Sequence, residues 1–386
     1  YLLPKPKTIK EQDGQMLLCH STHIVMTKEV AETEMHAAKR LQEAIRQETG
    51  LILPFSVGEV REGDLSLGIA KTLPEQTYEI TIDEKGGQIS GGDGAGVLYG
   101  VETFCQIVQQ CGGILPCVQI QDAPDMPNRG YYFDQTRGRV LKLEELKKIA
   151  DRMCRYKLNQ LQLYVEHTYL FRDFSEMWRD QTPLTAEEIR ELDSYCRERH
   201  IELVPSLASF GHLCTLLSTK TYGDLCEMED SWKEPFSFWN RMRYHTINVS
   251  DERSLPLIKK MIAEYMQLFS SNKFNICADE TFCLGKYKSK KLAEERGVHR
   301  LYIDYVKELA QFLVENGKIP MFWGDIIWNS PELMKELPES MICLNWGYAP
   351  EQREDETRAI AQTGAVQYLC PGVCGWNQWA NLIENS

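Results

Sequence analysis

From Gly130 onward the sequence alternates short apolar runs with amphipathic helical segments, and this rhythm constrains the fold more than any other feature. Such an alternation predicts parallel strands joined by helical crossovers. The apolar runs lie at 130–135, 161–165, 201–207, 273–278, 319–324, 341–347 and 365–370. Their spacing favours a (β/α)₈ barrel of the TIM type over an open sheet. The sequence reaches Ser386 without an eighth strand, so we expect a truncated barrel.

The first 125 residues have a different rhythm. A helix is predicted over 30–48, with Gly50 just past its end, and the segment 77–83 alternates polar and apolar residues before turning back on itself. The glycine-rich segment 91–96 reads GGDGAG, which lacks the G-x-G-x-x-G spacing of a dinucleotide loop and is interpreted as a turn before a helix. We predict a small α+β domain with an antiparallel sheet over 1–125 and a catalytic barrel domain over 126–386.

Composition and charge exclude several classes of function. The formal net charge is −13 and no basic patch stands out, which argues against nucleic acid as a partner. No segment has the apolar length of a membrane span, and the N-terminal segment lacks the apolar core of a signal peptide. The 13 cysteines show neither CxxC pairs nor zinc-ligand spacing, so we expect free thiols in a reducing, cytoplasmic compartment, no metal and no cofactor. Oligomeric state stays open.

The most informative pair is Asp279-Glu280, which directly follows the apolar run FNICA. In a barrel of parallel strands, active residues sit at the carboxyl ends of the strands. Two carboxyl groups in one cavity have pKa values that are pushed apart, so one can act as an acid while its neighbour stays charged. Cleavage of a glycosidic bond needs this division of labour. The dipeptide alone is more typical of an acidic helix start, whose charges interact favourably with the helix dipole.

Other predicted strand ends carry polar and aromatic residues suited to a sugar site. The set comprises Asp134, Arg137, Glu166, His167, His212, Trp323, Asp325, Trp346, Trp376 and Asn377. Aromatic rings can stack on sugar faces or pack in a core, and His212 can polarise a carboxylate or serve structure alone. Arg129, before the first strand, can hold sugar hydroxyls or tie the domains together. Glu166, His167 and His212 lie on different strands without a supporting cluster, so we expect no metal site.

Several segments, taken in order, resemble family 20 glycoside hydrolases. RGYYFDQTRGR, KLNQLQLYVEH, IELVPSLASFGH and FNICADE resemble successive barrel strands of that family. LLPKPKTI, YEITID and GGDGAGVLYGVETFCQI resemble the small domain that precedes its barrel. The family signature His-x-Gly-Gly-Asp-Glu reads NICADE here, at 275–280. The acidic pair is kept and the lead-in is not, which indicates a divergent branch.

The resemblance implies an exo-acting, retaining β-N-acetylhexosaminidase that removes terminal β-linked N-acetylglucosamine or N-acetylgalactosamine. Glu280 would be the general acid and base. Asp279 would orient the substrate's own 2-acetamido group, whose carbonyl oxygen attacks the anomeric carbon to give an oxazolinium intermediate. His212 would support the carboxylates.

The resemblance also implies sugar-binding roles. Arg129 would bind sugar hydroxyls, Trp323 would form a wall of the acetamide pocket, and Trp346 would line the sugar site. We also expect Glu166 among the substrate-binding residues. No tyrosine is assigned to the seventh-strand loop, where the family grips the acetamide, and Trp376 or Asn377 are expected in its place.

Two alternatives stay open at this stage. The altered lead-in, the missing eighth strand and the unassigned acetamide grip favour a relative that binds amino-sugar glycans with weak or no catalysis. An unrelated metal-dependent barrel enzyme is the other alternative. Hydrolysis assays and chelation discriminate among these possibilities.

Overall fold

The computed structural model describes residues 1–349 and 353–373, which form two compact units. The first unit comprises 1–131, 143–161 and 191–202, and the second takes the remaining residues. The predicted boundary near residue 125 falls between the last strand of the first sheet and the first strand of the second.

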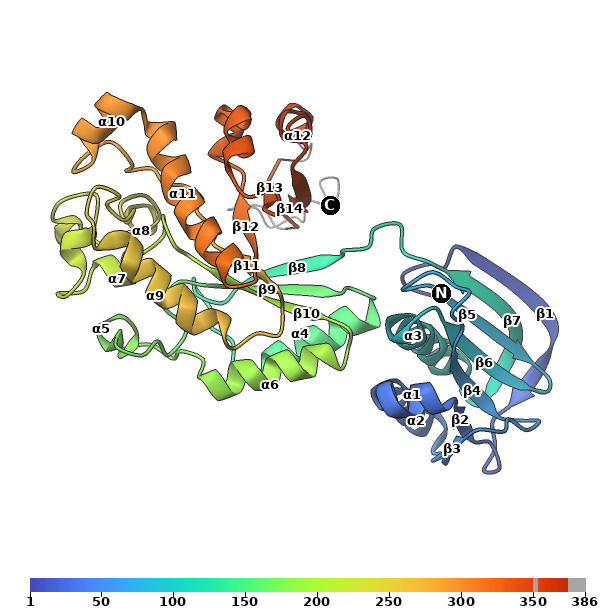
Figure 1. The fold of residues 1–386 in the computed structure, drawn as a ribbon. Helices are drawn as coiled ribbons and strands as arrows, with labels where there is room; N and C mark the ends of the chain where they lie inside the picture. The colour runs from blue at the N-terminus through green and yellow to red at the C-terminus, as the bar shows by residue number, and fades with distance from the viewer. Residues whose placement is uncertain (350–352, 374–386) are drawn as a thin grey trace. The chain divides into compact units, whose positions relative to one another are not determined.

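The first unit is built on a seven-stranded sheet with the order β1-β7-β5-β6-β4-β2-β3. Figure 1 shows its helices on one side of this sheet. The strands are β1 (Thr8–Leu17), β2 (Ile24–Met26), β3 (Phe55–Val57), β4 (Leu65–Ile69), β5 (Tyr78–Asp83), β6 (Gly86–Gly91) and β7 (Ile114–Asp122). The helices are α1 (Lys28–Thr33), α2 (Met35–Thr49) and α3 (Gly94–Cys111).

The first sheet is mixed, which corrects the antiparallel sheet expected from the sequence. The pairs β1·β7, β7·β5 and β5·β6 are antiparallel, but β6·β4, β4·β2 and β2·β3 are parallel. Helices α1 and α2 lie between β2 and β3 in the chain and supply the crossover that a parallel pair needs. The interpretation of GGDGAG as a turn before a helix is confirmed. Asp93 caps α3 by accepting a hydrogen bond from the Gly96 amide at 2.7 Å.

The second sheet contains the seven strands predicted from the alternating pattern, in the order β14-β13-β12-β11-β10-β9-β8 (Figure 1). Every pair from β10 to β14 is parallel. The sheet is curled, as in part of a TIM barrel. The strands are β8 (Gly130–Asp134), β9 (Gln160–Val165), β10 (Glu202–Leu207), β11 (Lys273–Asn275), β12 (Ile319–Trp323), β13 (Ile342–Gly347) and β14 (Val366–Pro371).

Helices alternate with these strands. They are α4 (Leu143–Arg155), α5 (Ser175–Trp178), α6 (Ala186–Arg197), α7 (Cys214–Leu217), α8 (Phe238–Arg243), α9 (Ser254–Met266), α10 (Lys290–Arg296), α11 (Val298–Glu315) and α12 (Glu354–Ala361). A capping box opens α6: the Glu188 amide donates to Thr185 Oγ1 at 3.2 Å, and the Thr185 amide donates to Glu188 Oε2 at 2.9 Å. Buried apolar residues such as Phe274 and Phe322 fill the sheet interior.

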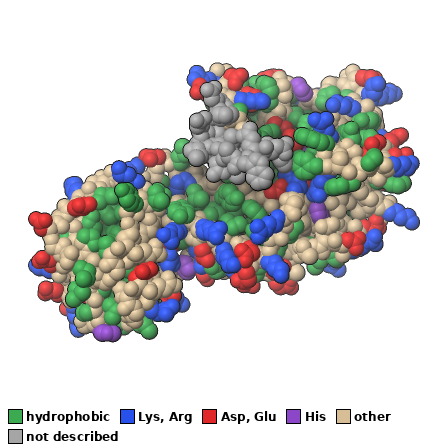
Figure 2. Space-filling view, turned by 180° about the vertical axis from the view of Figure 1, so that it is seen from behind, with side chains coloured by type: hydrophobic (Ala, Val, Ile, Leu, Met, Phe, Trp, Pro, Cys, Tyr) green, Lys and Arg blue, Asp and Glu red, His purple; other side chains and the backbone are tan. Residues whose placement is uncertain are grey.

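The surface carries its net negative charge in a dispersed form. On the face shown in Figure 2, Lys and Arg side chains are interspersed with Asp and Glu side chains rather than gathered in one basic field. Within 1–349 and 353–373, none of the helices combines the length and apolar character needed to cross a bilayer.

Candidate active site

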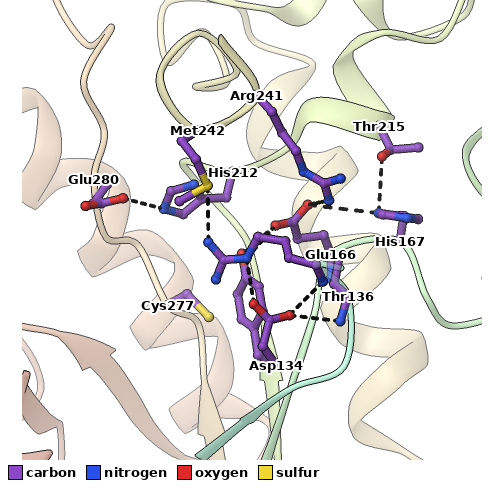
Figure 3. A network of polar contacts seen from close by, with 12 residues as sticks. Asp134, Thr136, Glu166, His167, His212, Thr215, Arg241, Met242, Cys277 and Glu280 are labelled. Carbon is purple, nitrogen blue, oxygen red and sulfur yellow. Dashed lines mark hydrogen bonds and ion pairs between the residues drawn. The ribbon is translucent and has the colours of Figure 1, made fainter. Parts of the chain in front are cut away.

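The acidic pair Asp279-Glu280 lies just beyond the carboxyl end of β11, where the chain leaves the sheet. Their side chains are 17% and 26% exposed, so both can reach a ligand while remaining largely desolvated. Nε2 of His212, from the loop after β10, lies 3.3 Å from a carboxylate oxygen of each. Figure 3 shows the His212 ring directed at Glu280. The structure therefore brings these three predicted residues together.

The backbone around this cluster adopts left-handed conformations that residues with side chains rarely take. Cys277, Ala278 and Glu280 have φ values of 58°, 63° and 49°, and His212 has 59°. Each such residue costs on the order of 1 kcal/mol. Cys277 and Ala278 stand at the positions of the two glycines in the family signature, and both adopt the left-handed conformation that glycine favours.

Neighbouring elements hold this strained segment in place. The Cys277 amide donates to Asn275 Oδ1 at 2.8 Å, and its carbonyl accepts from the Trp323 amide at 2.9 Å. The hydroxyl of Tyr302 on α11 donates to the Ala278 carbonyl at 2.9 Å. A Cβ atom at Gly211 would lie 2.6 Å from the Asp279 carbonyl oxygen, so only glycine permits this approach of the two loops.

Charge balance in the cluster favours a protonated histidine between two carboxylates. Burial opposes the charge on His212, but Asp279 and Glu280 outweigh it and raise the His212 pKa to about 10. Burial also opposes ionisation of Asp279, but His212 and then Arg137 hold the Asp279 pKa below its ordinary value. Asp279 is thus a charged acceptor at neutral pH, as a group that orients an amide N–H must be.

Asp325, just after β12, is a third carboxyl group beside the pair. Its Oδ2 accepts a hydrogen bond from the Glu280 amide at 3.0 Å, and its Oδ1 is shut off from solvent without a partner in the described part of the chain. Desolvation and the negative charge of Asp279 raise the Asp325 pKa well above its ordinary value. Both effects favour the protonated form of Asp325, whose Oδ2 fixes the Glu280 backbone.

Arg137, three residues after the end of β8, is the arginine that joins this cluster. Its Nε donates to Asp134 Oδ2 at 2.7 Å and lies 3.6 Å from Glu166 Oε1, and its Nη1 donates to the Met242 sulfur at 3.2 Å. The carboxylates of Asp134, Glu166 and Asp279 all contribute to raising the Arg137 pKa, against the effect of burial. The guanidinium is thus held in position beside the acidic pair.

Glu166 is buried and fully engaged by the protein. It accepts hydrogen bonds from the Tyr164 hydroxyl and from Arg241 Nη2, each at 2.9 Å, and Figure 3 shows Arg241 reaching it from α8. These partners assign Glu166 to positioning Arg137 and Arg241 rather than to direct contact with a ligand. The sequence analysis expected it among the substrate-binding residues, so its role changes although its location does not.

Arg129 does not join the acidic pair in this way. Its guanidinium donates to the carbonyls of Met126, Pro127 and Lys157 and to the side chains of Gln76 and Tyr99. All of these partners belong to the first unit. The donors of Arg129 thus have protein acceptors in this structure, and its expected sugar-binding role stays a prediction.

The predicted tryptophans lie on neighbouring strands of the second sheet. Trp323 is 7% exposed and packs edge-to-face against Tyr132, with ring centroids 4.9 Å apart. Trp323 pairs with Leu344, so Trp346, two residues further along β13, lies on the same face of the sheet. Trp346 is half-buried and its ring centroid lies 5.3 Å from that of Tyr348. Trp376 and Asn377 lie outside the described residues.

The donor types of the cluster also suit a metal ion. One nitrogen of His212 and one oxygen each of Asp279 and Glu280 lie within 4.8 Å of one another. In the metal-free protein the two acids favour the protonated form of His212, so a metal ion bound here would have to displace that proton. The same three side chains also suit acid–base chemistry.

Sequence reasoning missed three contributors to this site. Arg137 and Asp325 were noted at strand ends without a role, and Arg241 was not noted. The rule that active residues follow parallel strands favours Arg137, which follows β8, over Arg129, which precedes it. Arg241 lies on a short helix within the long connection between β10 and α9, for which no local pattern predicted a partner.

Family models match nearly the whole chain. Residues 1–123 match the second domain of glycosyl hydrolase family 20, and residues 127–374 match the catalytic domain of that family. A β-hexosaminidase of Porphyromonas gingivalis is 24% identical over 97% of this chain, and one of Vibrio furnissii is 26% identical over 72%. The chain spans about half the length of these relatives, 50% and 48%.

Solved structures of similar fold include the β-N-acetylhexosaminidase of Bacteroides fragilis, with a TM-score of 0.79 and 18% identity over 100% of this chain and 79% of that one. An exo-β-N-acetylglucosaminidase of Vibrio harveyi, in complex with N-acetylglucosamine, has a TM-score of 0.77 and 19% identity over 96% of this chain and 60% of that one. The matching models cover both units and contain the acidic pair, so this chain belongs to glycosyl hydrolase family 20.

Proposed function

We propose that this protein removes terminal β-linked N-acetylglucosamine or N-acetylgalactosamine from the non-reducing end of glycans by hydrolysis. The configuration at the anomeric carbon is retained. The observation that carries the proposal is the pairing of Asp279 and Glu280 around one protonated histidine, with both carboxylates still partly exposed. The relatives named β-hexosaminidase, and the similar structure that holds N-acetylglucosamine, support the same class of substrate.

In the first half of the reaction, Glu280 in its protonated form donates a proton to the glycosidic oxygen as the bond to the anomeric carbon breaks, and it becomes a carboxylate. Charged Asp279 accepts a hydrogen bond from the acetamide N–H and turns the acetamide carbonyl oxygen toward the anomeric carbon. That oxygen attacks, the leaving sugar departs with the proton, and an oxazolinium ion forms. No nucleophile from the protein is needed.

In the second half, Glu280, now a carboxylate, takes a proton from a water molecule that attacks the anomeric carbon. The oxazolinium ring opens, and two successive inversions restore the starting configuration. Asp325 keeps the Glu280 backbone in place through its hydrogen bond to the amide. Arg137, held by Asp134 and Glu166, is the nearest fixed guanidinium and would bind sugar hydroxyls.

Aromatic residues near the acidic pair would form the walls of the sugar site. Trp323 would close the acetamide side, because its ring lies against Tyr132 and its amide binds the strained segment before Asp279. Trp346 would stack on the sugar from the next strand. Trp376 or Asn377 would complete the acetamide grip from the segment after β14.

The test compares Glu280→Gln with wild type on an aryl 2-acetamido-β-glycoside. Turnover should fall by about 10²–10⁴-fold, as for loss of a general acid and base. Glu308→Gln, on an exposed side chain of α11, is the matched control and should leave turnover unchanged. Equal turnover of wild type and Glu280→Gln would remove Glu280 from the mechanism.

Substrate assistance has a test of its own. An aryl β-glucoside lacks the acetamide nucleophile, so it should be a very poor substrate next to the 2-acetamido glycoside. Comparable rates on both would contradict the mechanism. Binding of N-acetylglucosamine without any hydrolysis would identify an inactive relative, and loss of activity on chelation would identify a metal enzyme.

A further inference from the structure

The long connection between β10 and α9 exposes an unusual concentration of aromatic side chains. We call residues 231–243 the aromatic loop. Trp232, Phe236, Phe238 and Trp239 are 60%, 83%, 41% and 61% exposed, and all four lie within eight consecutive positions. Clustered exposed apolar side chains on a water-facing surface mark binding sites more often than accidents of packing.

The aromatic loop is a structured element. The Ser237 hydroxyl caps α8 by accepting from the Asn240 amide at 3.0 Å, and Asn240 Nδ2 donates to the Pro235 carbonyl at 2.7 Å. Backbone hydrogen bonds of Glu227 with Thr246 and of Asn248 with Leu225 close its base at 2.9 and 2.8 Å. The rings are therefore presented on a fixed support.

The aromatic loop is continuous with the acidic pair. Phe282, 42% exposed, is two residues after Glu280, and its amide donates to the Glu280 carbonyl at 2.7 Å. The Arg243 guanidinium lies 6.0 Å from the centre of the Phe282 ring and 5.3 Å from that of Trp239. Glu280, Phe282, Arg243 and Trp239 thus form an unbroken path from the general acid onto the loop.

The loop also shares side chains with the site. Arg241 binds Glu166, and Met242 accepts a hydrogen bond from Arg137. Beside them lies a cleft of about 130 Å³ whose lining includes the rings of Trp232, Pro235 and Phe236 and the polar side chains of Asn240 and Arg241. A lining that combines apolar rings with polar groups suits a sugar, which has apolar C–H faces and hydroxyl edges.

We propose that the aromatic loop and Phe282 bind the leaving-group side of the substrate, so that the preferred substrates are oligosaccharides in which further neutral sugars follow the terminal N-acetylhexosamine. This inference rests on the proposed function. The leaving sugar must depart beside the general acid Glu280, and the path of exposed rings begins two residues from it. A sugar is favoured because the loop presents four exposed aromatic rings, and because Arg241, which borders the cleft, is already paired with Glu166.

The experiment measures kcat/KM of wild type and Trp239→Ala on an aryl N-acetylglucosaminide and on a β-linked trisaccharide of N-acetylglucosamine. The variant should lose about tenfold on the trisaccharide, as for removal of a stacked ring, and nothing on the aryl monosaccharide. Phe236→Ala, at the most exposed ring, is a second variant with no role in α8. Tyr156→Ala, 45% exposed on the first unit, is the matched control and should affect neither substrate.

A binding measurement separates this inference from the proposed function. Calorimetry with Glu280→Gln protein should show tighter binding of the trisaccharide than of N-acetylglucosamine, and Trp239→Ala in that background should remove the difference. Failure of wild type to hydrolyse any 2-acetamido glycoside would overturn the proposed function only. Unchanged trisaccharide affinity in the Trp239→Ala protein would overturn the inference, as would equal losses on both substrates. Sedimentation showing that Trp239→Ala dissociates a dimer would instead assign the loop to a second copy of the chain.

Discussion

Two arginines flank strand β8, and their surroundings differ in kind. Arg129 precedes the strand and donates to three backbone carbonyls and two neutral side chains. Arg137 follows the strand and is surrounded by carboxylates and a methionine sulfur. The first arginine completes a structural network, whereas the second is a cation fixed beside acids that remain partly open to solvent.

A second contrast concerns the hydrogen-bond partners of buried polar groups in one charge cluster of each unit. In the first unit, Lys157 donates to the Tyr78 hydroxyl at 2.7 Å and to Asp122 at 3.3 Å, so a buried charge is matched locally. In the second unit, His212 Nδ1 and Asp325 Oδ1 lack hydrogen-bond partners among the described residues. Buried polar groups are normally satisfied, and departures from that rule concentrate where a ligand completes the network. Buried atoms without partners also occur in the first unit, at Thr77 Oγ1 and Arg155 Nε, so it is their position beside the acidic pair that marks His212 and Asp325 as candidate site residues.

The largest effect expected from this contrast is at the two arginines. Arg137→Lys keeps the charge but loses the planar fork, and kcat/KM should fall by about a hundredfold, the value of a charged hydrogen bond. Arg129→Lys should leave kcat/KM of the folded protein unchanged and lower Tm instead. Steady-state kinetics and thermal melts of both variants provide the measurement. If Arg129→Lys cost more activity than Arg137→Lys, the assignment of the two roles would be reversed.

The charge of His212 predicts how the stability of the protein depends on pH. Its pKa is raised in the folded protein, so its contribution to stability is fully present below the unfolded value of about 6.5 and is lost as pH rises through about 10. The Tm difference between wild type and His212→Asn should therefore shrink across that window. Melting curves at intervals of pH test this, and a difference that grows with pH would show that the folded histidine is neutral.

The smallest effect is expected at Asp325. Because burial and the charge of Asp279 favour the protonated form of this acid, Asp325→Asn keeps both an uncharged side chain and the acceptor for the Glu280 amide, and kcat should change little. Asp325→Ala removes the acceptor and should lower kcat with little effect on KM. Because the Asp325 pKa is raised in the folded protein, its protonated form stabilises the fold, and this contribution is lost as pH rises. The Tm of wild type should therefore fall with rising pH, and this part of the fall should be absent from both variants. A large loss of kcat in Asp325→Asn would mean that the charged form works.

Periodicity was sufficient to predict the second sheet, because each of its seven strands is a short apolar run bounded by helical segments. The capping box at Thr185 and the end of α2 at Gly50, which has a φ of 74°, could also be predicted. Both depend only on a few neighbouring residues. The mixed pairing of the first sheet was not, because partner choice among short strands depends on packing far along the chain. The acidic pair and His212 followed from strand ends and resemblance together.

Side-chain partnership was the part that sequence could not supply. The sequence alone does not distinguish the roles of Arg129 and Arg137. The structure distinguishes them by the hydrogen-bond acceptors around each guanidinium group. Asp325 was visible as a strand-end acid, but its raised pKa depends on desolvation and on the nearby charge of Asp279. Arg241 reaches Glu166 from 75 positions away, across a loop whose path no local pattern specifies.

The close approach at Gly211 has a mechanical consequence. An added methyl group there would lie 2.6 Å from the carbonyl oxygen of Asp279, so any other residue would force the loop after β10 away from the backbone that carries the acidic pair. The 3.3 Å spacing between His212 and the two acids therefore depends on the glycine beside the histidine. A redesign of this pocket would have to keep that glycine.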